Sequence, residues 1–138
     1  MTVANYKGLF TKFMEENGIK YTEKNDHHVI VSFSGKNNQA IKIHVDFNEN
    51  GDGMVQLYAW DIGNFGGDKT AKGVEVCNEL NAKYRWVKFY LDKDKDVCVS
   101  TDSYICEDNA AYVCLSLVRR MVSIADEAYP TFMKALWA

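Results

Sequence analysis

The chain lacks the features that mark linkers, membrane spans and basic binding surfaces. Its 138 residues contain one proline and no low-complexity run, which predicts one domain over residues 1–138 without a disordered tail. No apolar run approaches the ~20 residues that cross a bilayer. The N-terminus lacks the apolar core of a signal peptide. Because a net charge of −3 disfavours nucleic acid and anionic membranes, we expect a cytoplasmic protein with neither kind of partner.

The four cysteines do not have the spacing of a metal site. Cys77, Cys98, Cys106 and Cys114 form no C-x-x-C pair, and no histidine lies at zinc-finger spacing from any of them. Free cysteine is among the most often buried residue types, and it persists in reducing compartments. The sequence therefore predicts buried free thiols, and we expect no metal and no cofactor.

What the sequence does contain is a clear strand pattern between residues 85 and 101. Apolar side chains alternate with polar or aromatic ones on both sides of a charged turn at 92–96. A period of two is typical of strands with two unlike faces, so this stretch predicts a hairpin. The side chains expected to point inward are those of Val87, Phe89, Leu91, Val97, Val99 and Thr101.

Helical and strand patterns divide the rest of the chain. We expect helices over Val3–Asn17, from an N-cap at Asp68, and from an N-cap at Asp108 with a kink or restart at Pro130. The apolar stripe of the second helix comprises Ala71, Val74, Cys77, Leu80 and Tyr84, and that of the third comprises Ala111, Cys114, Leu117, Val118, Met121 and Ala125. Strands are expected over Lys20–Glu23, His28–Ser34, Ala40–Phe47 and Met54–Ile62.

The pairing of two of these strands follows from their pattern. If Phe47 lies opposite Val55 and Val45 opposite Leu57, the apolar residues share one face. A slip of one residue would bury Gln56, so the pattern selects this register. All tight connections are hairpins, which predicts an α+β domain of order α-β-β-β-α-β-β-α. Its mostly antiparallel sheet has five or six strands, with the helices packed on one face.

Three segments of the chain resemble a known family. Leu80–Leu91, Val97–Ser100 and the helix around Leu117–Ile124 are similar to the corresponding segments of YbjN-domain proteins. The resemblance implies the fold of type III secretion chaperones, a curved antiparallel sheet with flanking helices that is often dimeric. It also implies a regulatory role in sensory transduction and supplies no catalytic residue.

The loop Gly63–Thr70 approaches the phosphate-binding pattern G-x-x-x-x-G-K-[ST]. Asp68 stands where the pattern requires glycine, and its carboxylate would repel a phosphate. The pattern also belongs to parallel sheets, whereas hairpins dominate here. We therefore interpret the segment as a loop that leads into a helix.

Two acidic turns, 48–53 and 92–96, begin like EF-hand calcium loops. The twelfth position is Ala59 in the first and Ser103 in the second, where such a loop needs a bidentate glutamate. Both turns connect strands rather than helices. Solvated hairpin turns are the favoured interpretation.

The histidines could indicate a metal or a general base. In the expected register His28 faces Asp46, while His44 faces Ile30 and Tyr58 on the outward side of the sheet. If one strand contains both His27 and His28, they point to opposite faces and cannot share a metal. A surface polar pair is therefore favoured over a catalytic one.

The outward face of the predicted sheet is unusually aromatic. Outward faces of half-exposed antiparallel sheets are normally polar, whereas tyrosine and tryptophan are enriched at binding hot spots. We therefore predict an interface. Its residues are Ile30, Tyr58, Trp60, Trp86 and Tyr90. The alternative is that the segment after Pro130 folds over this face and covers part of it.

Two functions remain open at this point. The first is a non-enzymatic, chaperone-like or regulatory module, a homodimer that binds a protein or peptide on the aromatic face or on a sheet edge. The second is a small-ligand sensor or enzyme with a pocket between helices and sheet. A deep cavity with converging polar groups would favour the second, and a flat aromatic surface the first.

Overall fold

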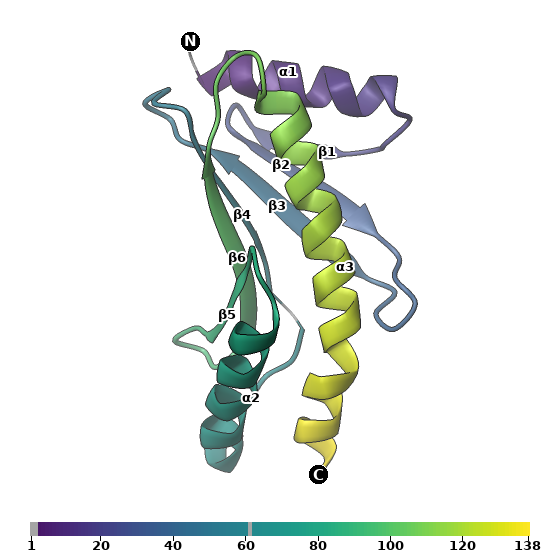
Figure 1. Cartoon of the computed structure of the whole chain (residues 1–138), viewed down its shortest axis with the longest axis vertical. Helices are drawn as coiled ribbons and strands as arrows, with labels where there is room; N and C mark the ends of the chain where they lie inside the picture. Colours follow the sequence, from purple (N-terminus) through teal and green to yellow (C-terminus); the bar gives the residue numbers. More distant parts are fainter. Residues whose placement is uncertain (1–2, 61) are drawn as a thin grey trace.

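A computed structural model describes residues 3–60 and 62–138. Within these ranges a six-stranded sheet lies behind three helices (Figure 1). The helices are α1 (Val3–Glu16), α2 (Thr70–Lys83) and α3 (Ala110–Trp137), with a short 3-10 turn η1 (Gly67–Lys69) before α2. The strands are β1 (Thr22–Asn25), β2 (His28–Phe33), β3 (Ile41–Phe47), β4 (Met54–Ala59), β5 (Lys88–Leu91) and β6 (Val97–Tyr104).

The sheet has the order β1-β2-β3-β4-β6-β5, and every neighbouring pair is antiparallel. Phe47 pairs with Val55 and Val45 with Leu57, which confirms the predicted register. The first strand forms one edge of the sheet, and it begins at Thr22 rather than Lys20. The predicted α+β class and the order of elements are confirmed, with β1 as a fourth strand before α2.

The core lies between the inward face of the sheet and the helices. Phe89 pairs with Val99 and is only 2% exposed, as its place in the alternating pattern predicts. Its ring centroid lies 5.5 Å from that of Phe132 near the end of α3, and Phe132 lies 6.0 Å from Phe65. β5, the loop before α2 and the C-terminal part of α3 therefore meet in one aromatic cluster.

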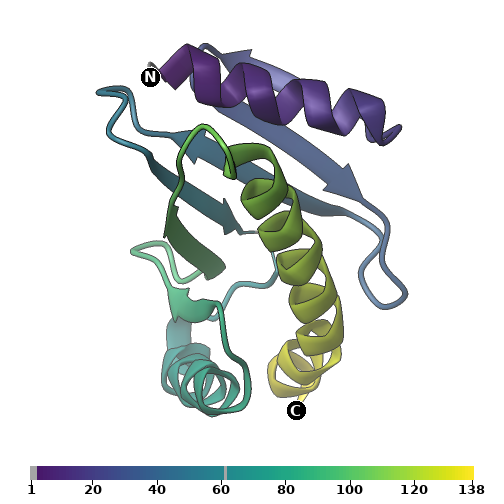
Figure 2. The same cartoon turned by 45° about the horizontal axis from the view of Figure 1, so that its top comes forward.

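Pro130 does not end α3, which is continuous from Ala110 to Trp137. Because Phe132 and Ala135 are buried after it, the C-terminal turns stay on the inward side. In Figure 2, α3 follows that side to its end. The alternative in which the segment after Pro130 covers the outward face is therefore wrong.

Both predicted helix caps are wrong. Asp68 lies inside η1, and α2 begins two residues later with Thr70, whose Oγ1 donates to the Phe65 carbonyl at 2.7 Å. At α3 the N-cap is Asn109, whose Oδ1 accepts from the Cys106 amide at 2.8 Å, so it closes the preceding turn. In each case a tight turn precedes the helix and displaces its start beyond the aspartate.

The buried face of α2 also differs from the predicted stripe. Val76 is buried, whereas Val74 is 55% exposed. Gly73 is buried as well, because Phe65 lies directly against it. Cys77 and Leu80 of the predicted stripe are buried, whereas its other members are not, so the buried side of α2 is shifted toward Gly73 and Val76.

α2 also protects one edge of the sheet. The Asn81 side chain accepts from the Phe89 amide at 2.7 Å and donates to the Phe89 carbonyl at 3.0 Å. These are backbone groups that a further strand would need, so Asn81 occupies the open edge of β5 at this point.

Gly73 tests the packing of α2, and Gly8 of α1 serves as the comparison. A Cβ at Gly73 would lie 2.6–2.7 Å from Phe65 atoms, so Gly73→Ala should lower the free energy of unfolding by about 1–3 kcal/mol. A Cβ at Gly8 of α1 meets nothing within 4 Å, so Gly8→Ala should raise it by about 0.5–1 kcal/mol. Urea melts of both variants measure the difference, and a Gly73→Ala protein as stable as the wild type would contradict the contact with Phe65.

Candidate binding face on the sheet

One row of residues crosses all six strands on the outward face, and the helices lie against the opposite face (Figures 1 and 2). Each member of the row is directly opposite the next on the neighbouring strand. In spatial order the row is Thr22, Ile30, His44, Tyr58, Ser100 and Lys88. His44 therefore faces Ile30 and Tyr58, as predicted from the register.

Four aromatic and imidazole side chains on this face form what we term the stacked cluster: His28, His44, Tyr58 and Trp60. The His44 ring stacks against the Trp60 ring at a centroid distance of 4.3 Å and against the Tyr58 ring at 5.1 Å, and the Tyr58 and Trp60 rings lie 5.8 Å from each other. His28 Nε2 and His44 Nδ1 are 2.8 Å apart and share a hydrogen bond. The cluster thus combines stacking with a directional bond between its two imidazoles.

The two clustered histidines are buried although they point outward. His28 is 5% and His44 6% exposed, since neighbouring rings cover them. The prediction of a surface polar pair is therefore wrong. Strand alternation gives the side of the sheet on which a side chain lies, but it does not show that larger neighbours on the same side can bury it.

Burial sets the charge of this cluster. It lowers the pKa of His44 to about 4, with smaller contributions from His28, Lys24 and Lys42. Burial also lowers the pKa of His28 and raises that of Tyr58. All three side chains are therefore neutral at pH 7, and the cluster presents an uncharged surface.

His27 has a different environment, in the turn between β1 and β2. Its Nδ1 lies 2.8 Å from Asp46 Oδ1, and its Nε2 lies 3.0 Å from Glu49 Oε1. It lines a depression of about 600 Å³ together with these carboxylates and Asp102. The hydrogen bonds of the three histidines thus go to carboxylates or to one another.

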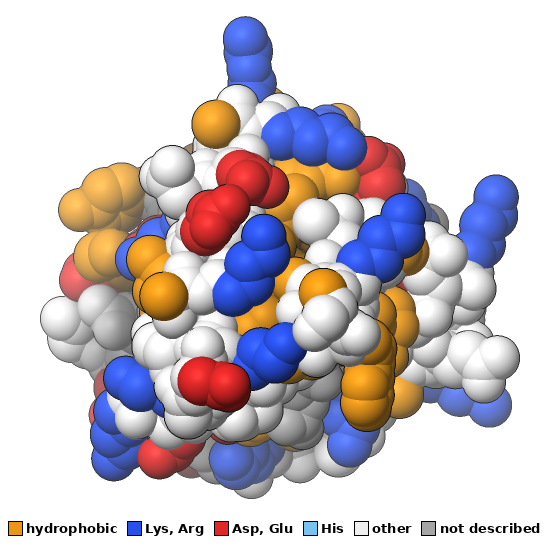
Figure 3. Space-filling model, turned by 90° about the horizontal axis from the view of Figure 1, so that it is seen from below, with side chains coloured by type: hydrophobic (Ala, Val, Ile, Leu, Met, Phe, Trp, Pro, Cys, Tyr) orange, Lys and Arg blue, Asp and Glu red, His pale blue; other side chains and the backbone are white. Residues whose placement is uncertain are grey.

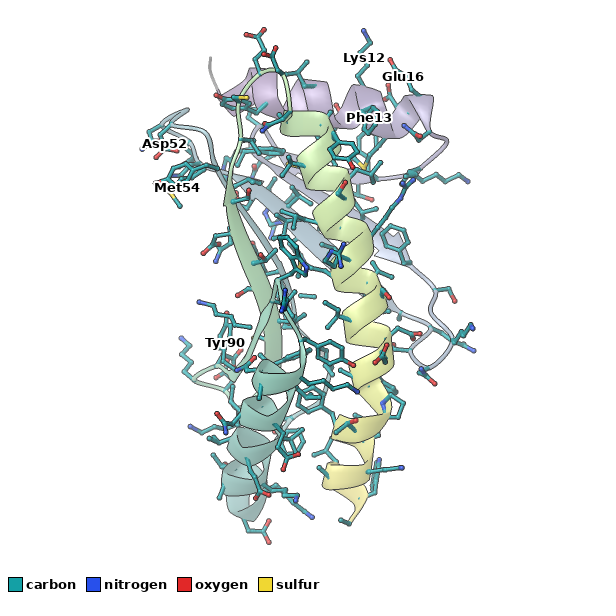
Figure 4. The ribbon with its side chains drawn as sticks, viewed as in Figure 1. Lys12, Phe13, Glu16, Asp52, Met54 and Tyr90 are labelled. Atoms are coloured by element: carbon teal, nitrogen blue, oxygen red, sulfur yellow. The ribbon has the colours of Figure 1, made fainter. Side chains whose placement is uncertain are left out.

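Four of the five predicted interface residues share the outward face. Ile30 and Tyr58 lie in the row and are half-buried, while Trp60 and Tyr90 are 42% and 39% exposed. Tyr90 lies opposite Cys98, and Lys88 Nζ lies 5.6 Å from its ring centroid. Figure 4 shows Tyr90 pointing away from α3.

Trp86 does not share this face, contrary to the prediction. It precedes β5 and has a φ of 81°. Its ring lies beneath the guanidinium of Arg120 on α3, with the Arg120 Cζ 5.1 Å from the ring centroid, so it is on the helical side. A left-handed residue breaks the strand alternation, and a bulky side chain in that conformation is too uncommon to expect from sequence.

In both acidic turns, carboxylates accept hydrogen bonds from backbone amides of the same turn. Asp92, Asp94 and Asp96 each place a carboxylate oxygen within 4.8 Å of the others. Asp92 Oδ1 accepts from the amides of Asp94 and Asp96 at 2.9 and 3.0 Å, and Asn64 Nδ2 donates to Asp96 Oδ1 at 2.9 Å. In the other turn, Asp52 accepts from the Met54 amide at 2.9 Å. These bonds are typical of hairpin turns.

The loop Gly63–Thr70 also has a structural role. Asn64 Nδ2 donates to the Asp94 carbonyl at 2.9 Å, and the Phe65 amide donates to the Lys95 carbonyl at 2.8 Å. The loop is therefore attached to the β5–β6 turn rather than open above a strand end.

Two solved structures share the fold of this chain. A chain of the heterodimeric ExoU–SpcU complex from the type III secretion system of Pseudomonas aeruginosa matches this structure with a TM-score of 0.54. The match covers 90% of this chain and 94% of that one, at 10% identity. YbjN from E. coli, described as "a putative transcription regulator", matches with a TM-score of 0.63 over 91% and 92% of the two chains, at 12% identity. At these identities the likeness is one of fold.

The sequence itself then gives the family. Residues 9–134 match the YbjN family model, described as "Putative bacterial sensory transduction regulator". The chain belongs to the YbjN family, which confirms the resemblance noted in its sequence. No curated protein matches this sequence. Among the described residues, no helix has both the length and the apolar character needed to cross a membrane.

The lowered pKa of His44 predicts acid destabilisation. Its folded value of about 4 lies below its ordinary value of 6.5, so the unfolded chain binds more protons between these pH values. The free energy of unfolding should therefore be highest above pH 6.5 and fall as the pH decreases toward 4. Urea melts at a series of pH values and an NMR titration of the His44 ring measure both effects.

The double variant His28→Leu, His44→Phe is the control for this prediction. It removes both titrating rings and keeps apolar contacts for Tyr58 and Trp60. Its loss of stability between pH 6.5 and 4 should be smaller than that of the wild type. An equal loss would show that other groups cause the acid sensitivity.

Proposed function

We propose that this protein is a non-enzymatic protein-binding module of chaperone-like or regulatory type. The observation that carries the proposal is the outward sheet face. On this face Trp60, a member of the neutral stacked cluster, and Tyr90 are both exposed. Rigid aromatic side chains provide contact area at low entropic cost, and they are enriched at binding hot spots. The family description and the fold of a chain found in a heterodimeric complex are consistent with this class of function.

The face rather than the β5 edge is the binding surface in this proposal. Strand addition at β5 would have to displace Asn81 from the Phe89 backbone. The β1 edge is only four residues long, and its register is interrupted between Glu23 and Asn25. Short and irregular edges are poor templates for a further strand.

A second copy of the chain is the simplest partner for this face. Asp46 and Lys42 flank His44 on β3, one toward each end of the strand, and both lie on the outward side. If the two-fold axis lay between the two faces and ran along the central row, across the strands, the Asp46 end of one face would lie over the Lys42 end of the other. The Trp60 and Tyr58 rings would lie near the centre of that contact, where hot spots concentrate.

Removal of the exposed rings tests this interface. Trp60→Ala combined with Tyr90→Ala should shift the dimer–monomer equilibrium toward monomer by at least about tenfold, since each ring is an anchor. Sedimentation or light scattering over a concentration series measures the equilibrium, and circular dichroism checks the fold. Trp137→Ala is the matched control, because Trp137 is 84% exposed at the end of α3, outside the face.

Two outcomes would contradict the proposal. A wild-type chain that is monomeric at all concentrations would exclude the second copy as partner. A folded double variant that associates as strongly as the wild type and the control would exclude the face.

A further inference from the structure

A pocket of about 410 Å³ adjoins the stacked cluster, where the start of β3 and the end of β4 meet Tyr129 of α3. Its volume is in the range of small-molecule sites. The lining side chains that carry the argument are Ile30, Asn38, Lys42, His44, Trp60 and Tyr129. They combine apolar or aromatic surface with three polar groups.

The pocket wall is held in place by Asp126, one helical turn before Tyr129. The Asp126 carboxylate accepts hydrogen bonds from the backbone amides of Lys36, Asn37 and Asn38, at 3.1, 2.8 and 2.9 Å. These bonds lower the pKa of Asp126 and attach the β2–β3 loop to α3. The Asp126 carboxylate is thus bonded to the loop backbone rather than to a pocket ligand. Its bonds also hold Asn38 and Tyr129 in place before any ligand binds.

His44 supplies an accessible polar atom to the pocket, although the residue as a whole is buried. Its side chain is 6% exposed, and its Nδ1 is bonded to His28. Its Nε2 has no hydrogen-bond partner among the described residues, so this is the atom that His44 can offer a ligand. When His28 Nε2 donates to His44 Nδ1, a neutral His44 carries its proton on Nε2 and donates into the pocket.

The charge and shape of the lining indicate the ligand class. Among the described lining residues only Lys42 is charged, which favours an anion. At the end of the molecule that holds the C-terminus of α3, Lys and Arg side chains predominate over Asp and Glu (Figure 3). The Trp60 and Tyr129 rings and Ile30 provide surface for a flat apolar body.

We propose that this pocket binds a small aromatic carboxylate. The carboxylate would lie between the Lys42 ammonium, the side-chain Nδ2 of Asn38 and the His44 Nε2–H. The ring would lie against Trp60 and Tyr129. Charge-assisted bonds from an ammonium and an imidazole N–H are suited to a carboxylate. All lining residues of this site belong to one chain, so the pocket forms without a second copy.

The test uses 3-phenylpropionate as the probe with the full-length chain at pH 7. Saturable NMR shifts are expected at the Trp60 indole and at the His44 ring nitrogens, with the His44 ¹⁵N shifts moving toward the Nε2–H tautomer. 3-Phenylpropanol has the same ring and chain length without the charge, and should bind at least about tenfold more weakly. Light scattering on the same samples measures the oligomeric state, so ligand binding and dimer formation are tested separately.

Two lysine variants give the matched comparison. Lys42→Met removes the charge in the pocket and should weaken binding of 3-phenylpropionate by about tenfold. Lys88→Met removes a charge from the same sheet face outside the pocket, and should leave binding within about twofold of the wild type. Circular dichroism checks that both variants fold.

Three results would overturn the proposal. The first is the absence of a saturable shift at Trp60 and His44 up to millimolar probe. The second is equal binding of the alcohol and the carboxylate, which would exclude anion recognition. The third is an equal loss in Lys42→Met and Lys88→Met, which would reflect the general charge of the face.

Discussion

The register between β3 and β4 is the constraint on which both the core and the candidate site depend. It places Val45 opposite Leu57 on the inward face and, one residue away, His44 opposite Tyr58 on the outward face. A slip of one residue would exchange the two faces. The hydrophobic requirement of the core therefore also determines which side chains meet outside it, and the stacked cluster is a geometric consequence of the same pairing.

The sequence was sufficient for this part of the structure because strand alternation is a local property. The register and the opposition of His44 to Ile30 and Tyr58 followed from which side chains were apolar. Features that depend on contacts between distant segments were not accessible. The attachment of Asp126 to the β2–β3 loop joins residues almost ninety positions apart, and no local pattern marks an aspartate whose partners are backbone amides.

Local rules failed where the backbone departs from its most common forms. The α2 start moved because a 3-10 turn precedes it, and Trp86 left the outward face because its φ is positive. The predicted exposure of the histidines is wrong for another reason. Burial depends on the size of the neighbours, and the Trp60 and Tyr58 rings together cover an imidazole that a smaller pair would leave in water. The alternating pattern alone distinguishes the two faces of a sheet, but it does not show how deeply the side chains on each face are buried.

Trp60 belongs to both proposals, and this has a thermodynamic consequence. It is exposed on the face proposed to bind a partner, and it lines the pocket proposed to bind a carboxylate. A partner that covers the ring and a ligand that packs against it must change each other's affinity by the same factor, since coupling between two sites is reciprocal. The sign depends on whether the covered ring keeps its stack on His44, because that stack holds the imidazole in position. A residue shared in this way would connect ligand binding to the assembly state without any change in the fold.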